Sequence, residues 1–337
     1  MIYGLLRRAL FHLDAERAHE WTAGQIEHIQ QVPLLLRAIE RWCRPPASAQ
    51  RTLLGLTFPS PIGIAGGFDK NATMIPFLAA LGFGFIEVGT VTLRPQAGNP
   101  RPRLFRYPAE KALINRMGFN NDGADAVAER LRTRATAVPV FVNVGKNKDV
   151  ALEGAVENYV ECYRRVAMYA DAAVLNLSSP NTPGLRELQR PEHLEALLLG
   201  VRSVKAGAVL IKIAPDLEEA QIDEIADVCA RLAEGMICTN TTIDRLPGMT
   251  EAGGLSGKPL KEKSTRVLAR VRARVGPRYP LIGVGGVFTP EDVREKIGAG
   301  ADLVQLYTSF IYEGPGIASR LARGCSELAQ PEFRPSP

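Results

Sequence analysis

The stretch VLIKIAPD at residues 209–216 joins a short apolar run to polar residues at its end. Seven further segments have the same form, with glycine, amide or hydroxyl residues after the apolar run. The eight segments span residues 62–65, 85–91, 140–144, 173–177, 209–213, 236–238, 281–284 and 303–306. Continuous apolar runs of this length are typical of strands buried on both faces of a parallel sheet.

Helix-like segments separate most of these runs, which predicts an α/β fold. Examples are residues 71–81, 150–169, 217–232, 263–275 and 289–298. Eight strands over roughly 270 residues are the count and size of a (β/α)8 TIM barrel. The alternative is a doubly wound sheet. It is disfavoured because the best candidate for a dinucleotide fingerprint, residues 283–288, has Phe288 where the third glycine is needed.

The first 46 residues predict a small helical extension that differs from the rest of the chain. Residues 5–13 place leucines on one helical stripe, and Asp14 is a suitable N-cap for a second helix. Pro33 precedes a third short helix over residues 34–42, and Pro45 helps to end it. The extension is either a cap on the main domain or an amphipathic element at a membrane surface. We therefore divide the chain into residues 1–46 and a barrel domain at residues 47–337.

Composition excludes several classes of protein. Of the 337 residues, 46% are hydrophobic, which is enough for a core and excludes wholesale disorder. Five scattered cysteines without a CxxC pair exclude a disulfide scaffold and a cysteine zinc site, and we expect no metal. No apolar run is long enough to span a membrane, and Arg7, Arg8, Asp14 and Glu16 leave no room for a signal peptide.

The net charge of +5 is compatible with nucleic acid, anionic lipid or an anionic substrate. The chain has no run of five basic residues and no nucleic-acid-binding motif, so we expect no nucleic-acid partner.

The polar residues at the strand ends predict a site, because a barrel carries its chemistry at the carboxyl ends of its strands. Amides suit a planar heterocycle with imide edges better than a metal; they are Asn115, Asn143, Asn176, Asn181 and Asn240. Lys212 lies within an apolar strand, where a lysine needs an anionic partner. Turns at residues 283–286 and 307–308 follow the last two strands, where barrels commonly bind phosphate. These features indicate a phosphate-bearing cofactor or substrate beside a small polar ring.

The catalytic base is less clear from the residues alone. The chain has no HExxH, GxSxG or Walker A pattern, and we expect His193 to be solvated before a helix. Ser179 lies on the loop 178–182 and is the conspicuous candidate, although a serine needs activation by its neighbours and often serves only as a hydrogen-bonding group.

Several motifs together resemble the dihydroorotate dehydrogenase family. They are NLSSPNTPGLR (176–186), NRMGFNN (115–121), KIAPD (212–216), TNTT (239–242), GGLSGKPL (253–260), VGTVTLRPQAGNPRPRLFR (88–106) and LDAERAHEW (13–21). The resemblance covers nearly the whole chain and is strongest to class 2, the membrane-associated, quinone-reducing branch. Serine at 179, where class 1 enzymes carry cysteine, and the helical extension both favour class 2.

The resemblance implies an FMN-containing oxidoreductase of pyrimidine biosynthesis that oxidises dihydroorotate to orotate and reduces a quinone, in a ping-pong cycle. Ser179 would remove the C5 proton while the C6 hydride passes to N5 of FMN, and Phe119 and Thr182 would shape the proton route. The residues that match the orotate-site positions are Lys70, Asn115, Arg116, Met117, Gly118, Phe119, Asn176, Asn181, Asn240 and Thr241.

The resemblance also implies positions for the cofactor and the quinone. The residues that match the FMN positions are Gly66, Gly67, Phe68, Asp69, Lys70, Thr90, Asn143, Asn176, Lys212, Thr239, Gly257, Gly286, Tyr307 and Thr308. Lys212 would stabilise the reduced flavin near N1 and O2. The N-terminal helices would form a quinone tunnel from the membrane, with His19, Arg106 and Tyr307 at its inner end.

We accordingly expect a monomer that is peripherally bound to the cytoplasmic face of the inner membrane. One alternative is a soluble dehydrogenase that uses fumarate or NAD, with the N-terminal helices as a dimer interface. A second alternative is a non-catalytic barrel that binds a phosphorylated ligand.

Overall fold

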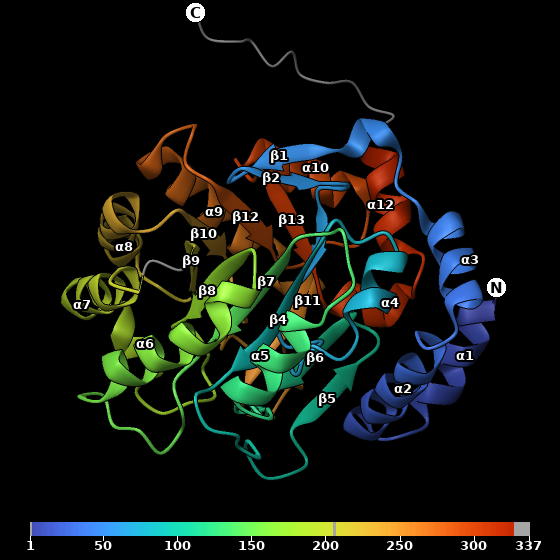
Figure 1. The fold of residues 1–337 in the computed structure, drawn as a ribbon, viewed down its shortest axis with the longest axis horizontal. Helices are drawn as coiled ribbons and strands as arrows, with labels where there is room; N and C mark the ends of the chain where they lie inside the picture. Colours follow the sequence, from blue (N-terminus) through green and yellow to red (C-terminus); the bar gives the residue numbers. More distant parts are fainter. Residues whose placement is uncertain (1, 205–206, 327–337) are drawn as a thin grey trace, which may run out of the picture.

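The computed structural model describes residues 2–204 and 207–326, and within them eight parallel strands close into a barrel (Figure 1). Around the barrel these strands are β3 (Ile62–Ile64), β4 (Phe85–Val91), β7 (Val140–Val144), β8 (Ala172–Asn176), β9 (Ala208–Ile213), β10 (Gly235–Cys238), β12 (Leu281–Val284) and β13 (Leu303–Leu306). Each of the eight predicted apolar runs forms one of these strands, with boundaries that differ by at most one residue. The predicted (β/α)8 barrel is therefore confirmed.

Helices cover the outside of the barrel. They are α4 (Ile75–Ala80), α5 (Ala124–Arg132), α6 (Ala155–Val166), α7 (Pro191–Arg202), α8 (Glu219–Leu232), α9 (Lys261–Val275), α10 (Pro290–Gly298), α11 (Thr308–Glu313) and α12 (Ile317–Ser326). The prediction had no helix at α5, and it placed His193 before a helix, whereas His193 lies in the first turn of α7 and its Nδ1 contacts the Glu187 carbonyl at 3.0 Å. Thr289 caps α10 in a capping box with Asp292, which explains the sharp start of that helix.

The inside of the barrel is a packed apolar core. Phe85 and Phe141 point inward from neighbouring strands, and Phe58 meets both rings edge-on. Phe58 belongs to a hairpin of β1 (Arg51–Leu53) and β2 (Leu56–Phe58), which closes the end of the barrel at which the strands begin. This plug leaves the carboxyl ends of the strands as the open end.

A three-stranded antiparallel sheet, which the sequence analysis did not predict, stands at the open end. Its strands are β5 (Leu104–Tyr107), β6 (Ala112–Asn115) and β11 (Gly254–Gly257), paired in the order β11-β6-β5. The first two strands come from the long connection after β4 and the third from the connection after β10. The sheet therefore unites segments that lie about 140 residues apart, as its pairing of Leu255 with Ile114 shows.

The N-terminal residues form three helices on one side of the barrel, at the right of Figure 1: α1 (Ile2–Phe11), α2 (Ala15–Ile29) and α3 (Pro33–Cys43). Asp14 caps α2 as predicted, since its carboxylate accepts hydrogen bonds from the amides of residues 16 and 17. Pro33 occupies the first turn of α3, where proline is well tolerated. In the described part of the chain, no helix combines the length and apolar character that crossing a membrane requires.

Candidate active site

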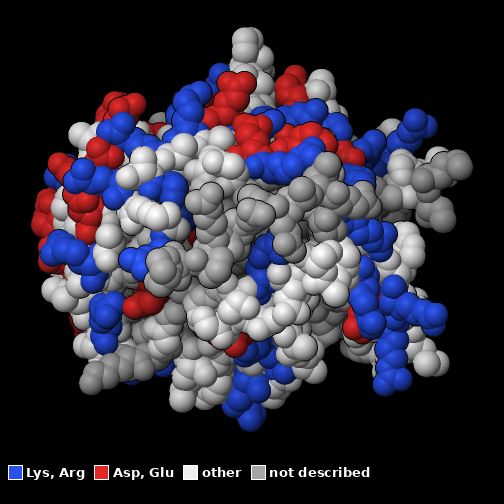
Figure 2. Space-filling model, turned by 90° about the horizontal axis from the view of Figure 1, so that it is seen from above, with Lys and Arg blue, Asp and Glu red and all other residues white. Residues whose placement is uncertain are grey.

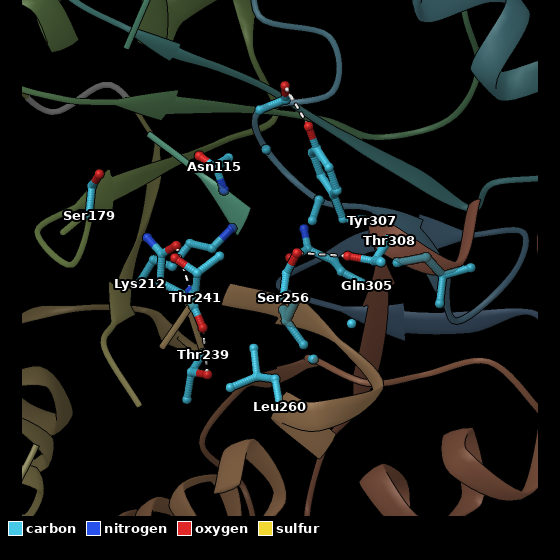
Figure 3. A pocket seen from close by; sticks show the side chains of 18 of the residues that line it. Asn115, Ser179, Lys212, Thr239, Thr241, Ser256, Leu260, Gln305, Tyr307 and Thr308 are labelled. Carbon is cyan, nitrogen blue, oxygen red and sulfur yellow. Dashed lines mark hydrogen bonds between the residues drawn. The ribbon is translucent and has the colours of Figure 1, made fainter. Parts of the chain in front are cut away.

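A cavity at the open end of the barrel gathers most of the predicted site residues, and we call it the mouth cavity (Figure 3). Its open space, including the entrance, is about 1000 Å³. Lining residues come from every barrel strand end except that of β7 and from the antiparallel sheet; they include Gly66, Gly67, Lys70, Thr90, Asn115, Met117, Gly118, Phe119, Asn176, Ser179, Asn181, Lys212, Thr239, Asn240, Thr241, Gly257, Gly286, Tyr307 and Thr308.

A chain of amide side chains runs through the wall of the mouth cavity. Asn240 Nδ2 donates to Asn176 Oδ1 at 3.1 Å and to Ser178 Oγ at 2.9 Å. Asn176 Nδ2 in turn donates to Thr90 Oγ1 at 3.0 Å and to Asn143 Oδ1 at 3.3 Å. Each amide is oriented by the next, so their remaining donors and acceptors are presented to the cavity in fixed positions.

The row of hydrogen-bonded amides ends at a buried ion pair between Glu87 and Lys212. Glu87 in β4 accepts hydrogen bonds from Asn143 Nδ2 at 2.5 Å, Gln305 Nε2 at 2.6 Å and Lys212 Nζ at 3.1 Å. Lys212 lines the cavity, whereas Glu87 is 0% exposed beneath it. The prediction that Lys212 needs an anionic partner is confirmed. Glu87 itself was missed, although a carboxylate inside the apolar run FIEV carries the same signal as the lysine.

Ser179 lies at one end of the mouth cavity and Tyr307 at the other (Figure 3). The Ser179 side chain is buried, and its Oγ accepts a hydrogen bond from the Asn181 amide at 3.3 Å. The loop is held from both sides, because Arg186 Nε donates to the Ser178 carbonyl at 3.1 Å and Asn99 Nδ2 donates to the Asn181 carbonyl at 3.2 Å. Thr182 Oγ1 is buried and has no hydrogen-bond partner among the described residues, so it can still bond to a ligand or water.

The turn at residues 117–119 faces Ser179 from the connection after β6. Gly118 and Phe119 both have positive φ, at 74° and 56°, and Phe119 is the unusual one because L side chains disfavour this region. Asn121 stabilises the turn, since its Nδ2 donates to the Phe119 carbonyl at 2.8 Å and its Oδ1 accepts from the Gly123 amide at 2.8 Å. The strained turn is therefore built to present the Phe119 ring to the cavity.

Glycine turns form the floor near β12 and β13. Gly286 has φ of 74°, and a Cβ there would overlap the Lys261 backbone. Gly257 has φ of 102°, and a Cβ there would overlap the Lys111 carbonyl and approach Thr308. Turns of this kind expose backbone N–H groups without a side chain in the way, which is the geometry that phosphate binding requires.

A second cavity, which we call the apolar cavity, lies between the N-terminal helices and the barrel. It has about 1370 Å³ of open space and is lined mainly by apolar side chains of α1, α2, β5 and α11. The three predicted quinone-site residues, His19, Arg106 and Tyr307, all line it. Arg106 stacks on the Phe11 ring at 4.5 Å and donates to the Leu10 carbonyl at 3.1 Å, so its guanidinium also holds the end of α1. Tyr307 lines the mouth cavity as well and thus separates the two.

A third hollow, the polar groove, runs between α2 and the loop before α4. Lys70 and Met117 line both the groove and the mouth cavity, while His19 and Phe68 line both the groove and the apolar cavity. Burial, reinforced by the charge of Arg103, lowers the pKa of Lys70 to about 8. Burial and the nearby Lys70 charge lower the pKa of His19 to about 3, so His19 is neutral at physiological pH.

Four of the predicted FMN and orotate residues lie outside the mouth cavity. Arg116 stacks on Phe105 at 4.5 Å and its NH1 pairs with Glu251 at 2.6 Å. Asp69 is buried and accepts hydrogen bonds from the amides of residues 73 and 74, which is a structural role. Phe68 lines the apolar cavity, and Asn143 supports Asn176 from below. Lining residues that the sequence analysis did not select include Ser256, Leu260, Val287, Phe288 and Gln305.

Comparisons with known proteins agree with this architecture. A family model described as dihydroorotate dehydrogenase matches residues 48–328. A dihydroorotate dehydrogenase (quinone) from Thermobifida fusca is 49% identical, over 98% of this chain and 92% of the relative, and one from Mycobacterium marinum is 47% identical, over 96% and 94%. A crystal structure described as DHODH from Eimeria tenella in complex with ferulenol has 36% identity and a TM-score of 0.82, covering 92% of this chain and 90% of that one.

Proposed function

This chain belongs to the dihydroorotate dehydrogenase family, with the quinone-dependent activity of its relatives, and we propose that it works through FMN bound in the mouth cavity. In the proposed cycle dihydroorotate reduces the cofactor and leaves as orotate, after which a quinone reoxidises the cofactor from the apolar cavity. The observation that carries this proposal is the convergence of Ser179, the amide chain and Lys212 on one cavity that shares Tyr307 with an apolar one.

The residues of the mouth cavity fit FMN. Gln305 Oε1 is a buried acceptor without a partner in the described part of the chain, so the cavity wall has unmet hydrogen-bonding capacity of the kind a flavin ring can satisfy. The glycine turns at 257 and 285–286, with Thr308, would hold the phosphate through backbone N–H groups. Gly66, Gly67, Thr90, Asn176, Lys212, Thr239 and Tyr307 would surround the ring, with Asn143 behind Asn176. FMN, when bound, supplies the two-electron acceptor.

The Glu87–Lys212 pair would set the electrostatics beneath the cofactor. Lys212 offers a cation to the ring at the cavity wall, and Glu87 fixes the direction of that cation through the 3.1 Å contact. A cation at this place favours the reduced, anionic state of a flavin. Because Glu87 also holds Asn143 and Gln305, one carboxylate organises three of the strands that bear on the ring.

Dihydroorotate would bind between Ser179 and the cofactor. Its imide edges match the amides of Asn115, Asn176, Asn181 and Asn240, which offer donors and acceptors together. Lys70 would pair with the substrate carboxylate, and Met117, Gly118 and Thr241 complete the enclosure. Arg116 would act indirectly, by holding the turn through its contacts outside the cavity.

Ser179 Oγ would take the C5 proton of the substrate. Its burial excludes bulk water, and the Asn181 amide holds its oxygen at 3.3 Å. Thr182 Oγ1 lies three residues further along the same loop, buried and without a hydrogen-bond partner among the described residues, and it would pass that proton onward. This arrangement needs no histidine.

Residues 1–46 would serve as the quinone-binding and membrane-associating unit, and residues 47–337 as the catalytic domain. Exposed apolar side chains concentrate in the first unit; Leu34 is 78% and Trp42 is 70% exposed. α1 and α3 also carry exposed arginines, such as Arg8 and Arg37. Blue Lys and Arg side chains predominate at the right edge of Figure 2, the side on which Figure 1 shows these helices. Both features suit a peripheral position on the cytoplasmic face of an anionic membrane. We propose that the protein acts there as a monomer.

The test is to bleach and recolour the purified protein. We expect it to be yellow with bound FMN, to lose colour with dihydroorotate and to regain colour with a short-tailed quinone. A colourless protein that cannot be reconstituted with FMN would contradict the proposed cofactor. Bleaching that only fumarate or NAD reverses would contradict the quinone half of the cycle.

A further inference from the structure

Helix α2 forms a wall between the polar groove and the apolar cavity. One face of the helix, with Glu20, Ala23 and Glu27, lines the groove. The opposite face, with Ala18, Thr22 and Ile26, lines the apolar cavity. The groove is open to solvent and carries carboxylates, arginines and amides, whereas the apolar cavity is dominated by aliphatic and aromatic side chains.

His19 is the polar side chain that reaches both sides of this wall. Among the described residues, only His19 and Phe68 line both hollows, and their rings meet edge-on with centroids 5.3 Å apart. No hydrogen bond from His19 to another described side chain or backbone group is found, so both ring nitrogens are open to ligands or water. The ring therefore bridges solvent and the apolar cavity.

Reduction of a quinone in the apolar cavity requires a source of protons. Conversion to the quinol takes up two electrons and two protons; the electrons and one proton come with the reduced cofactor, and the second proton has to come from solvent. The hydroxyls of Tyr3 and Tyr307 are poor sources, because burial raises the pKa of each to about 12. Arg106 is engaged by backbone carbonyls at the end of α1.

We propose that the polar groove is the proton inlet for quinone reduction and that His19 is its relay. The inference rests on the proposed quinone site. A ring N–H of His19 passes its proton to the quinone oxygen, while the other ring nitrogen accepts a proton from water in the groove. The quinone is reduced, the cofactor is oxidised, and solvent supplies one proton for each quinol formed.

The groups around His19 favour a neutral imidazole that relays a proton over an imidazolium that holds one. Burial, with the charge of Lys70, lowers the pKa of His19 to about 3, so the ring has one donor and one acceptor nitrogen across the working pH range. The charged side chains that line the two hollows are Glu16, Glu20, Glu27, Asp69, Lys70, Asp122, Arg130 and Arg134 in the polar groove and Arg106 in the apolar cavity. Glu16 is itself committed to Arg103, at 2.7 Å.

The first test follows reoxidation of the dihydroorotate-reduced holoenzyme by a short-tailed quinone. We expect His19→Ala to slow this step about a hundredfold, the usual size of a general acid–base contribution. Imidazole added to this variant should restore the rate, through the groove. Reoxidation by ferricyanide, which takes electrons without a proton, should be unchanged. Loss of the quinone rate without imidazole rescue, at saturating quinone, would overturn the relay and leave His19 as a packing residue.

The second test leaves His19 in place and narrows the groove. Ala23→Trp puts a bulky side chain on the groove face of α2, one turn from His19, and should slow quinone reoxidation and enlarge its solvent isotope effect. Arg17→Trp is the matched control, because Arg17 is exposed on the same helix and lines neither hollow. If Ala23→Trp instead raises the KM for dihydroorotate and spares reoxidation, the groove is a substrate entrance and the inlet proposal is wrong. Failure of the wild-type protein to bleach or recolour would count against the proposed function itself.

Discussion

The mouth cavity and the apolar cavity meet at Tyr307, yet they are built in different ways. The mouth cavity is lined by strand ends whose amides, glycines and ion pair are locked to one another, from Asn240 down to Glu87. The apolar cavity is lined by helices that are attached to the barrel by separate contacts, such as Gln30 Nε2 to the Thr73 carbonyl at 2.6 Å and the buried ion pair of Glu16 with Arg103 at 2.7 Å. Polar walls whose groups hold one another suit a reaction that needs fixed geometry, and an apolar wall suits an apolar ligand.

The largest expected effect comes from removing the proposed base, Ser179, from the mouth cavity. Ser179→Ala should slow flavin reduction by dihydroorotate by about 10²- to 10⁴-fold, because the acceptor of the C5 proton is lost. Bound FMN and reoxidation by quinone should remain, as measured by flavin absorbance and stopped-flow kinetics. Ser203→Ala, at an exposed position, is the control. Undiminished reduction in Ser179→Ala would remove the serine from the mechanism.

Removing the Glu87–Lys212 ion pair tests whether the walls of the mouth cavity are held together by their buried contacts. Glu87→Met should lower the free energy of unfolding by about 3–5 kcal/mol, because the Lys212 charge is left buried without its partner. The double variant Glu87→Met/Lys212→Met should recover much of that loss, which denaturant titration would measure. Glu129→Gln, which breaks an exposed pair with Arg132, should have no measurable effect. Equal stability of Glu87→Met and wild type would mean that the pair does not organise the cavity.

Binding to membrane vesicles should depend on exposed apolar side chains of the N-terminal helices and not on those of the barrel. Leu34→Ser and Trp42→Ser each remove an exposed apolar side chain, and each should weaken binding to anionic vesicles roughly tenfold, from a burial free energy of about 1.5 kcal/mol or more. Met168→Ser, equally exposed on the barrel, should leave vesicle binding unchanged. Dihydroorotate-driven bleaching should stay constant in all three. Unaltered vesicle sedimentation of the Leu34 and Trp42 variants would place the membrane contact elsewhere.

The smallest expected effect is the pH dependence of substrate binding. The pKa of Lys70 is lowered to about 8, so the ammonium is charged below that pH and is lost as the pH rises through it. The KM for dihydroorotate should therefore rise several-fold between pH 7 and 9, as steady-state assays would measure. Lys70→Met should have a high KM that is insensitive to pH in this range. A flat profile in the wild-type protein would show that Lys70 does not pair with the substrate.

The barrel could be predicted from the chain because its signal is local. Each of the eight strands is a continuous apolar run with a polar end, and this pattern survives without knowledge of neighbours. The predicted N-cap at Asp14 was also correct, since capping depends on adjacent residues. Helix α5 escaped prediction, and the antiparallel sheet did so because its pairing joins Leu113 to Ser256 across the chain.

The candidate site also has a part that local sequence signals predict and a part that depends on contacts across the fold. The combination of strand-end position with the family resemblance selected most of the lining residues of the mouth cavity. It could not select Glu87, which is hidden beneath the site, or exclude Asp69, whose carboxylate turns to backbone amides instead. The direction of a side chain within a loop depends on contacts that only the folded chain provides.

The order of residues was enough to predict the barrel, its eight strands and the helical extension, because hydrophobic period and polarity are properties of neighbouring residues. The tertiary structure alone decided that Lys212 finds Glu87, that Tyr307 separates two cavities, and that His19 bridges solvent and the apolar cavity. Barrel closure and the docking of α2 create these juxtapositions between residues far apart in the chain. These contacts are stabilised by burial and by charge pairing between different helices and strands, and no pattern of neighbouring residues encodes them.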